Sequence, residues 1–439
     1  MRRCGVAGNT VTSLSVQRKL FLPLVFLVTL AVISPAFAND PVLHNDYALK
    51  LLEQGEYEKG LEHFQRAFAF SPYDETLRKN LAEAYTYVGM RQMEQKLYDA
   101  AADSFDHARE LFPEAPRYAV LRGIALHAVK RYEGAIHELE RARSLGETSP
   151  ELYYHLGRAY YDSDNLALAL EMWEKGLELD PARAAIRELA DKARRELALE
   201  GRMDKGYSSR FSLSYDTELK SLLAGEILDV LEAAYNRVGA DLGYFPDARV
   251  QVLLYTKKDF KALTDSPDWS GGLYDGKIRI PLGGATGMTA LLRNVLVHEY
   301  THVVVFEMTK GNCPTWLNEG LAELEGRKEF NQPMAELGRV ARRGGYVSFQ
   351  LLERPFSTLS DKQVALAYQQ SYALVNFMVG RYGWHKIQEI LRLLGTGKPV
   401  ADAIGVALAD YGVDYSGVVQ EWQGNMTREY GVPEHPSPE

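Results

Sequence analysis

Between residues 211 and 282 the spacing of hydrophobic positions alternates between two periods. Phe211–Tyr215 places apolar residues at every second position, and Val250–Tyr255 is another short run of strand-forming residues, so both are predicted strands. Leu219–Val238, between them, has the spacing of an amphipathic helix. Leu273–Leu282 carries a central Asp-Gly turn signal, which indicates a hairpin or an edge strand. This part of the chain is therefore expected to mix helices and strands.

The pattern changes again at residue 291, where a predicted helix becomes apolar on almost every side, as in a buried helix. His298-Glu299-Tyr300-Thr301-His302 lies in the middle of this helix. Side chains four residues apart share a face, so His298 and His302 can bind one metal ion. Glu299, about 100° around the helix, can reach a water molecule on that ion. The alternative is a histidine pair satisfied within the core.

A second predicted helix follows Pro314 and contains two glutamates four residues apart. Glu319 is predicted to be the third metal ligand. Glu323, one turn later, faces the same way and is expected to accept the free N–H of His298. The alternative is that both glutamates belong to a solvated helix face. Cys313 is either another ligand or a small buried or loop residue, and two histidines, Glu319 and water already make four ligands.

The two motifs, HEYTH and WLNEGLAE, resemble those of the gluzincin zinc peptidases, most closely the peptidase MA-like domains of secreted bacterial proteins. The resemblance covers roughly residues 205–430. It implies an α+β, thermolysin-like fold, bound Zn²⁺, hydrolysis of peptide bonds, Glu319 as a ligand and Glu323 as the residue that orients a histidine. Only sixteen residues separate His302 from Glu319, which implies a short connecting turn.

The same resemblance implies two further elements of the site. An edge strand above the zinc is expected to hold the substrate backbone by strand addition, and an ordinary outer strand is the alternative. The residues expected in that edge strand are Lys277, Ile278, Arg279 and Ile280. A hydrogen-bond donor for the oxyanion is expected from a helix over residues 362–380. Tyr372 is the predicted donor, with Tyr368 and His385 as its rivals. The alternative is that both tyrosines are core residues.

The first half of the chain repeats every 34 residues. Small residues recur at three repeat positions, where the two helices of a tetratricopeptide unit approach closely; they include Gly89, Gly123, Gly157, Ala101, Ala135 and Ala169. Period and resemblance together predict an all-α array over residues 41–200. Its units lie near 41–74, 82–115, 116–149 and 150–183, with seven extra residues between the first two and a charged cap helix over 184–200. Such arrays bind peptides or protein segments, and tyrosines 85, 87, 118, 153, 154 and 161 are candidates either for that contact or for packing.

The remaining segments are a predicted signal peptide, a linker and a tail. Residues 1–38 combine a basic start, an apolar run of fourteen residues and an Ala36-Phe37-Ala38 cleavage signal; an uncleaved membrane anchor is the alternative. Residues 201–209 are expected to link the array to a domain over 210–430, and 431–439 form a tail. We therefore expect export from a bacterial cell, to the periplasm or beyond, with no stable membrane span after cleavage.

The net charge and the cysteine content argue against two features, a nucleic-acid partner and an intrachain disulfide. The net charge is −9 and no dense basic stretch occurs, which argues against a nucleic-acid partner. After cleavage only Cys313 remains, so no intrachain disulfide forms. The sequence predicts an exported zinc metallopeptidase whose array recruits protein substrates or partners. The alternative is an adaptor or assembly factor of the cell envelope with a non-catalytic zinc domain, which would not need the carboxylate of Glu299.

Overall fold

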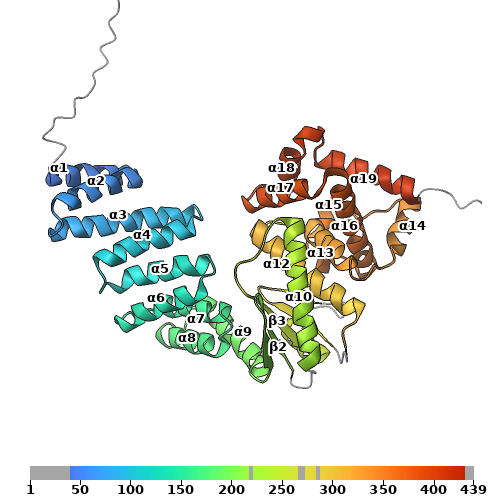
Figure 1. The fold of residues 1–439 in the computed structure, drawn as a ribbon, viewed down its shortest axis with the longest axis horizontal. Coiled ribbons are helices and arrows are strands. Elements are labelled where there is room, and N and C mark those ends of the chain that lie inside the picture. The colour runs from blue at the N-terminus through green and yellow to red at the C-terminus, as the bar shows by residue number, and fades with distance from the viewer. Residues whose placement is uncertain (1–39, 217–220, 265–271, 283–286, 431–439) are drawn as a thin grey trace, which may run out of the picture. The chain divides into compact units, whose positions relative to one another are not determined.

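The computed structural model describes residues 40–216, 221–264, 272–282 and 287–430 (Figure 1). The predicted signal peptide (1–38) and tail (431–439) lie outside the described residues. The chain forms two compact units, Met1–Val88 and Gly89–Glu439, which are described separately.

The N-terminal array is built from helix pairs. In the first unit α1 (Pro41–Glu53) packs on α2 (Tyr57–Phe70). The boundary between the units falls within α3 (Glu75–Glu94). This helix is 20 residues long, and the seven extra positions between the first two repeats lengthen it by about two turns. In the second unit each helix packs on the next: α4 (Tyr98–Leu111), α5 (Pro116–Ala128), α6 (Tyr132–Ser144), α7 (Pro150–Asp162), α8 (Leu166–Leu179) and α9 (Ala184–Glu200). The predicted tetratricopeptide solenoid and its final helix are thus present.

The 34-residue period has a packing cause in the second unit. A side chain at Gly89 would come within 2.6 Å of Phe105, and one at Gly123 within 2.7 Å of Leu139. One at Gly157 would come within 2.4 Å of Trp173, so the large partners also recur every 34 residues. A glycine on the first helix of each pair therefore lets a large residue of the second helix pack against its backbone.

The C-terminal domain, β1 to α19, contains a five-stranded sheet. Its strands are β1 (Asp204–Tyr207), β2 (Phe211–Tyr215), β3 (Val250–Tyr255), β4 (Leu273–Tyr274) and β5 (Ile278–Pro281), in the order β1-β2-β3-β5-β4. β2, β3 and β5 run parallel, whereas β1 and β4 pair antiparallel at the two edges. The predicted linker over 201–209 is therefore wrong in its central part, because residues 204–207 are a strand of this sheet.

The two faces of the sheet are covered by different helices. Ile278 and Ile280 of β5 are buried in the main core with α10 (Ser221–Leu242) and the metal-motif helix α12 (Ala290–Thr309). The alternating positions, Lys277 and Arg279, instead make ion pairs with α9, and α11 (Lys257–Thr264) covers the same face of the sheet as α9. The last helix of the array thus packs directly on the sheet.

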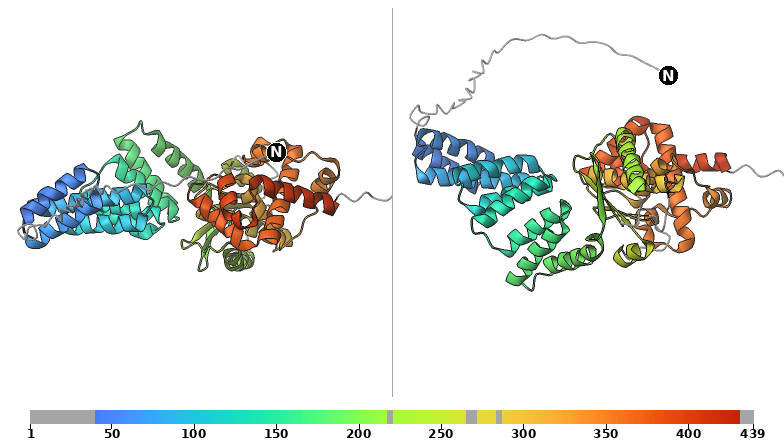
Figure 2. Two further views of the ribbon diagram at one scale, coloured as in Figure 1. Left: turned by 90° about the horizontal axis from the view of Figure 1, so that it is seen from above. Right: turned by 60° about the horizontal axis from the view of Figure 1, so that its bottom comes forward.

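After the sheet the chain is helical. The remaining elements are α13 (Thr315–Arg327), α14 (Ala335–Arg343), α15 (Phe349–Leu352), η2 (Phe356–Thr358), α16 (Asp361–Tyr382), α17 (Trp384–Gly395), α18 (Val400–Ala407), η3 (Ala409–Tyr411) and α19 (Tyr415–Tyr430). Figure 2 shows these helices, orange to red, gathered beside the sheet. Among the described residues, no helix is both long enough and apolar enough to cross a membrane.

Candidate metal centre and its cavity

Two helices joined by a tight turn create the candidate metal centre. The side chain of Thr289 accepts a hydrogen bond from the Leu292 amide at the start of α12. The helix ends where Lys310 (φ 53°) and Gly311 (φ 78°) take left-handed conformations. The chain then reverses, and α13 packs back along α12. This reversal accommodates the short motif spacing and brings Glu319 to the two histidines.

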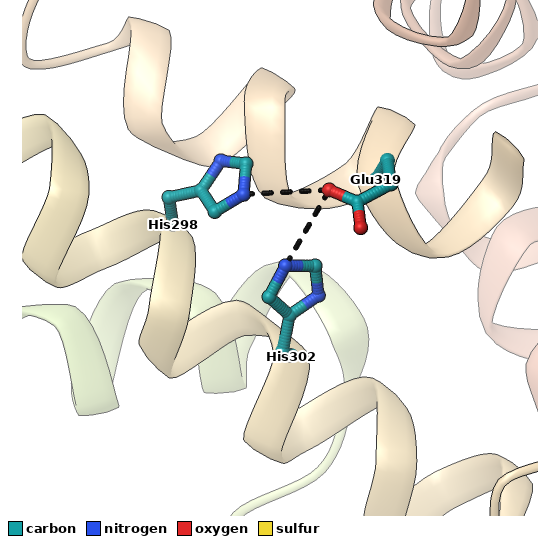
Figure 3. A group of neighbouring side chains, drawn as sticks. All are labelled: His298, His302 and Glu319. Atoms are coloured by element: carbon teal, nitrogen blue, oxygen red, sulfur yellow. Dashed lines mark ion pairs between the residues drawn. The ribbon is translucent and has the colours of Figure 1, made fainter. Parts of the chain in front are cut away.

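His298, His302 and Glu319 form a triad with the dimensions of a metal site (Figure 3). Nε2 of His298 and Nε2 of His302 each lie 3.5 Å from Oε2 of Glu319. Ligands about 2.0–2.1 Å from a tetrahedral zinc ion lie about 3.3 Å from one another. Oε2 of Glu319 is buried and has no hydrogen-bond partner among the described residues. The three groups therefore fit a small cation at their centre.

Each histidine is oriented through its other ring nitrogen. Nδ1 of His302 lies 3.0 Å from Oδ1 of Asn318, and Nδ1 of His298 lies 3.5 Å from Oε1 of Glu323. Arg327 donates from Nε to the other oxygen of Glu323, at 2.9 Å. With Nδ1 protonated against an oxygen, each Nε2 presents its lone pair to the centre.

The charges of the site also favour a cation. Burial acts to lower the pKa of His298, but Glu319, Glu299 and Glu323 outweigh it and raise that pKa to about 9. Burial acts to raise the pKa of Glu319, yet the charges of His302 and His298 hold it below its ordinary value. The carboxylates around the imidazoles stabilise positive charge. Without a metal this charge is a bound proton, and the same charges would stabilise a metal cation.

Glu299 lies beside the triad rather than in it. Its side chain is 5% exposed, and burial raises the pKa of its carboxyl above the ordinary value despite the opposing charges of His302 and His298. The carboxylate packs against the backbone of Gly272, just before β4: a side chain there would come within 2.5 Å of Oε1 of Glu299. A carboxyl group in this position beside a metal site can take a proton from a water molecule and pass it on.

These groups open into a cavity of about 1070 Å³. α12 forms one wall, α13 and α16 contribute the metal-side residues and Tyr368, and residues 272–274 approach from the sheet. The ring of Tyr274 packs edge-on against Phe306 of α12, with 5.7 Å between ring centroids. The edge strand that borders the site is therefore β4.

The predicted substrate strand over Lys277, Ile278, Arg279 and Ile280 is wrong. β5 lies between β3 and β4: residues 278–281 pair with β3, and Ile278 and Arg279 also pair with β4, so β5 is not the edge of the sheet. Arg279 is 2% exposed and donates to Glu196 at 2.6 Å and to Glu200 at 3.0 Å. The charges that mark this strand in the sequence bind the array helix α9.

The two candidate tyrosines occupy different environments. Tyr368 lines the cavity, and Glu319, Glu299 and Glu323 act with burial to raise the pKa of its hydroxyl. Tyr372 is not among the described residues that line the cavity; the guanidinium of Arg327 lies 4.5 Å from its ring centroid. His385 is likewise outside the described lining, whereas Cys313 lines the cavity without joining the triad. The rival, Tyr368, is thus better placed than Tyr372.

Three residues with clear roles around the centre were not identified from sequence. Asn318 lies in the WLNEGLAE motif directly before the predicted ligand Glu319, so its position near the metal could have been predicted from the sequence. Arg327 lies four residues after Glu323, a spacing typical of helical ion pairs. Gly272 belongs to a Gly-Gly pair before the hairpin and carries no local sign that it approaches Glu299.

The array also reaches α12 directly. Lys130, in the turn between α5 and α6, forms an ion pair with Glu307, which also accepts a hydrogen bond from Tyr244 at 3.0 Å. Of the tyrosines proposed for partner contact, Tyr118 is buried and Tyr161 donates to Glu196 of α9, whereas Tyr87 is 48% exposed. Packing thus accounts for Tyr118 and Tyr161.

Comparison with known proteins agrees with this two-part organisation. Residues 232–428 match the model of the peptidase MA superfamily, and residues 150–183 match the tetratricopeptide repeat model. The chain thus has a peptidase MA superfamily domain, of a generally metal-dependent kind, and a tetratricopeptide repeat.

Relatives of the array are found separately. The small glutamine-rich tetratricopeptide repeat-containing protein 2 of Mycosarcoma maydis is 31% identical over 116 residues, which are 26% of this chain and 32% of that protein. The chain therefore spans about a third of this curated relative. Similar solved structures include the first tetratricopeptide domain of Spaghetti bound to an HSP90 peptide, at 23% identity and a TM-score of 0.27, covering 27% of this chain and 95% of that chain. Another is the tetratricopeptide protein YrrB, at 24% identity and a TM-score of 0.31, covering 37% of this chain and 82% of that one.

Proposed function

We propose that this protein is an exported, zinc-dependent metallopeptidase of the gluzincin type whose array recruits protein substrates or partners. The observation that carries the proposal is the convergence of His298, His302 and Glu319 with a separate buried carboxylate, Glu299, beside them. Two imidazoles and one carboxylate leave a fourth tetrahedral position open, as in catalytic zinc sites. A purely structural site would have no use for a further carboxylate beside its ligands.

When bound, zinc would acidify a water molecule and polarise the carbonyl of a scissile peptide bond. The protein residues supply the rest of the chemistry. Glu299 takes the proton of the attacking water and delivers it to the leaving amine, a role that suits its raised pKa. Tyr368, at the cavity wall, donates a hydrogen bond to the developing oxyanion. Asn318 and Glu323 hold the histidines in the required tautomers.

The outer edge of β4 suits binding of a substrate backbone. Among the described strands only β5 pairs with β4, and Leu273 and Tyr274 both line the cavity. An extended peptide placed along this edge would add a strand to the sheet and lie over Glu299. The array supplies a second contact surface, because tetratricopeptide repeats commonly bind peptides or proteins.

The decisive experiment compares the wild-type protein with Glu299→Gln. Both should contain one zinc per chain, and only the wild type should generate new protein termini when the two are expressed in the native cells and exported proteins are compared. Zinc-loaded Glu299→Gln that retains full function would support the adaptor alternative. His302→Ala is the matched control, because it should lose the metal as well as the activity.

A further inference from the structure

We infer, resting on the proposed function, that the substrate is an internal, extended segment of a polypeptide with apolar side chains on both sides of the cleaved bond. The site would thus act as an endopeptidase. The inference rests on the course of the cavity along α12 and on the chemistry of its wall.

The cavity follows one face of α12 for most of the helix. Leu291, Val295, His298, His302 and Phe306 recur at steps of three or four residues, and all line the cavity. At 1.5 Å per residue, Leu291 and Phe306 are about 22 Å apart along the helix. An extended peptide of about six or seven residues spans that length.

The metal ligands stand between the two ends of this face. From their midpoint the wall continues about 13 Å toward Leu291 and about 9 Å toward Phe306. A site that removes single terminal residues would need the wall to close on one side of the metal centre. Among the described residues the lining extends to both sides of the metal centre, so a substrate chain can continue in both directions from the cleaved bond.

Both ends of the wall expose large apolar side chains. Leu291 is 53% exposed and Phe306 is 48% exposed, although each lines the cavity and neighbours buried residues of the same helix. Tyr274 packs against Phe306 and extends the apolar surface onto β4. Exposed apolar surface next to a reactive centre is stabilised when a substrate covers it.

The charged groups of the wall leave no anchor for a peptide terminus among the described lining residues. The acidic side chains there are Glu299, Glu319 and Glu323, which belong to the metal centre and its proton transfer. The one arginine, Arg327, donates to Glu323 at 2.9 Å and to the carbonyl of Gln332 at 2.6 Å. Recognition within the described cavity therefore depends on backbone and apolar contacts.

Binding to the zinc-loaded Glu299→Gln protein tests the inference without requiring turnover. The probes are fluorescent peptides of four, seven and ten residues, rich in leucine and phenylalanine or in serine and lysine, each with free or with acetylated and amidated ends. The apolar peptides should bind equally with free or blocked ends, and affinity should rise up to about seven residues. Leu291→Ala and Phe306→Ala should each weaken binding about fivefold to tenfold. Val406→Ala and Phe330→Ala, at positions 52% and 43% exposed outside the cavity lining, are matched controls and should change nothing.

Mass spectrometry of the same peptides with wild-type protein gives the second readout, in which cuts should fall inside blocked apolar peptides. A requirement for a free end, stepwise loss of single residues, or binding that ignores both Leu291 and Phe306 would overturn the inference. If the zinc-loaded wild type cuts no peptide, the proposed function fails, and the binding series still decides whether the groove takes an extended apolar segment.

Discussion

Asn318 accepts a hydrogen bond from His302: Oδ1 of the amide lies 3.0 Å from Nδ1 of the imidazole. The residue that follows, Glu319, reaches the opposite nitrogen of the same ring across the candidate centre. Two consecutive residues of α13 thus contact the two ring nitrogens of His302.

Replacing Asn318 by alanine should weaken metal binding about tenfold to a hundredfold, because the imidazole loses the acceptor that fixes its tautomer. Asn318→Asp keeps an acceptor and should bind metal much better than the alanine variant. A chelator competition measures both. Asn236→Ala is the control, since that side chain donates to the Glu232 carbonyl of its own helix. Equal affinities for the three variants would show that the hydrogen bond does not orient His302.

Alanine substitution of the two glutamates of α13 should reduce zinc binding to different extents. Glu319→Ala removes a ligand and should abolish stoichiometric zinc binding, whereas Glu323→Ala should weaken it by about tenfold to a hundredfold. The comparison is made by metal analysis after dialysis against a weak chelator. If Glu323→Ala loses zinc more completely, the roles of the two carboxylates are reversed. If neither substitution changes the zinc content, α13 does not contribute to metal binding.

Gly272→Ala should impair catalysis while leaving the metal in place. The added methyl group would collide with the carboxylate of Glu299, and a displacement of about 1 Å at a reacting group can cost about a hundredfold in rate. Zinc content and peptide cleavage are measured on the same preparation. Gly225→Ala, in open space on α10, is the control. Unchanged cleavage by Gly272→Ala would show that Glu299 does not need this position.

The metal-free protein should lose stability as pH rises from about 6.5 to about 9. The pKa of His298 is raised to about 9 in the folded protein, against 6.5 for an ordinary histidine. The folded state therefore holds this proton more tightly than the unfolded state, and the stabilisation, complete below pH 6.5, disappears as the pH passes through 9. Melting temperatures of the chelator-treated protein test this. A His298→Asn variant should show a flatter profile, and a wild-type melting temperature that rises over this range would contradict the prediction.

The C-terminal domain should not fold when cut from the array at residue 205. Without α9, Lys277 and Arg279 lose the carboxylates of Glu196 and Glu200, and the face of the sheet that this helix covers is exposed to water. Losing these ion pairs together with the packing of the helix removes several kcal/mol, a large part of a domain's stability. Circular dichroism of chains starting at Lys205 and at Ala184 makes the comparison, and only the longer chain should melt cooperatively. A stably folded shorter chain would show that α9 is dispensable.

Local patterns with a strict geometric cause were predictable from sequence. The 34-residue period follows from glycines packed against Phe105, Leu139 and Trp173, and the bounds of β2 and β3 match their alternating or apolar runs. The triad was predictable because spacing on a helix fixes which residues share a face, and because the two motifs resemble those of known zinc peptidases.

Features that depend on tertiary partners were not predictable. The resemblance to gluzincins placed Lys277 and Arg279 in an exposed edge strand, and nothing local contradicted it, because the helix that neutralises their charges lies about 80 residues earlier in the chain. Tyr368 and Tyr372 share a helix face by sequence, and tertiary packing distinguishes them: Tyr368 lines the cavity, whereas the guanidinium of Arg327 packs on the ring of Tyr372. The strand β1 was hidden in a polar, glycine-flanked segment with too few apolar positions to reveal it.

The pairing of α9 with β5 defines where this architecture can be recombined. A repeat added or removed upstream of α5 leaves in place the four buried charges and the contacts that α7 and the α5–α6 turn make with the C-terminal domain, so array length can change there without affecting the sheet. A junction placed between α9 and β1 separates charges that were buried together. Chimaeras, whether natural or engineered, should therefore keep α9 together with the C-terminal domain. The unit that can be transferred as a whole begins with the last helix of the solenoid and not with the first strand of the sheet.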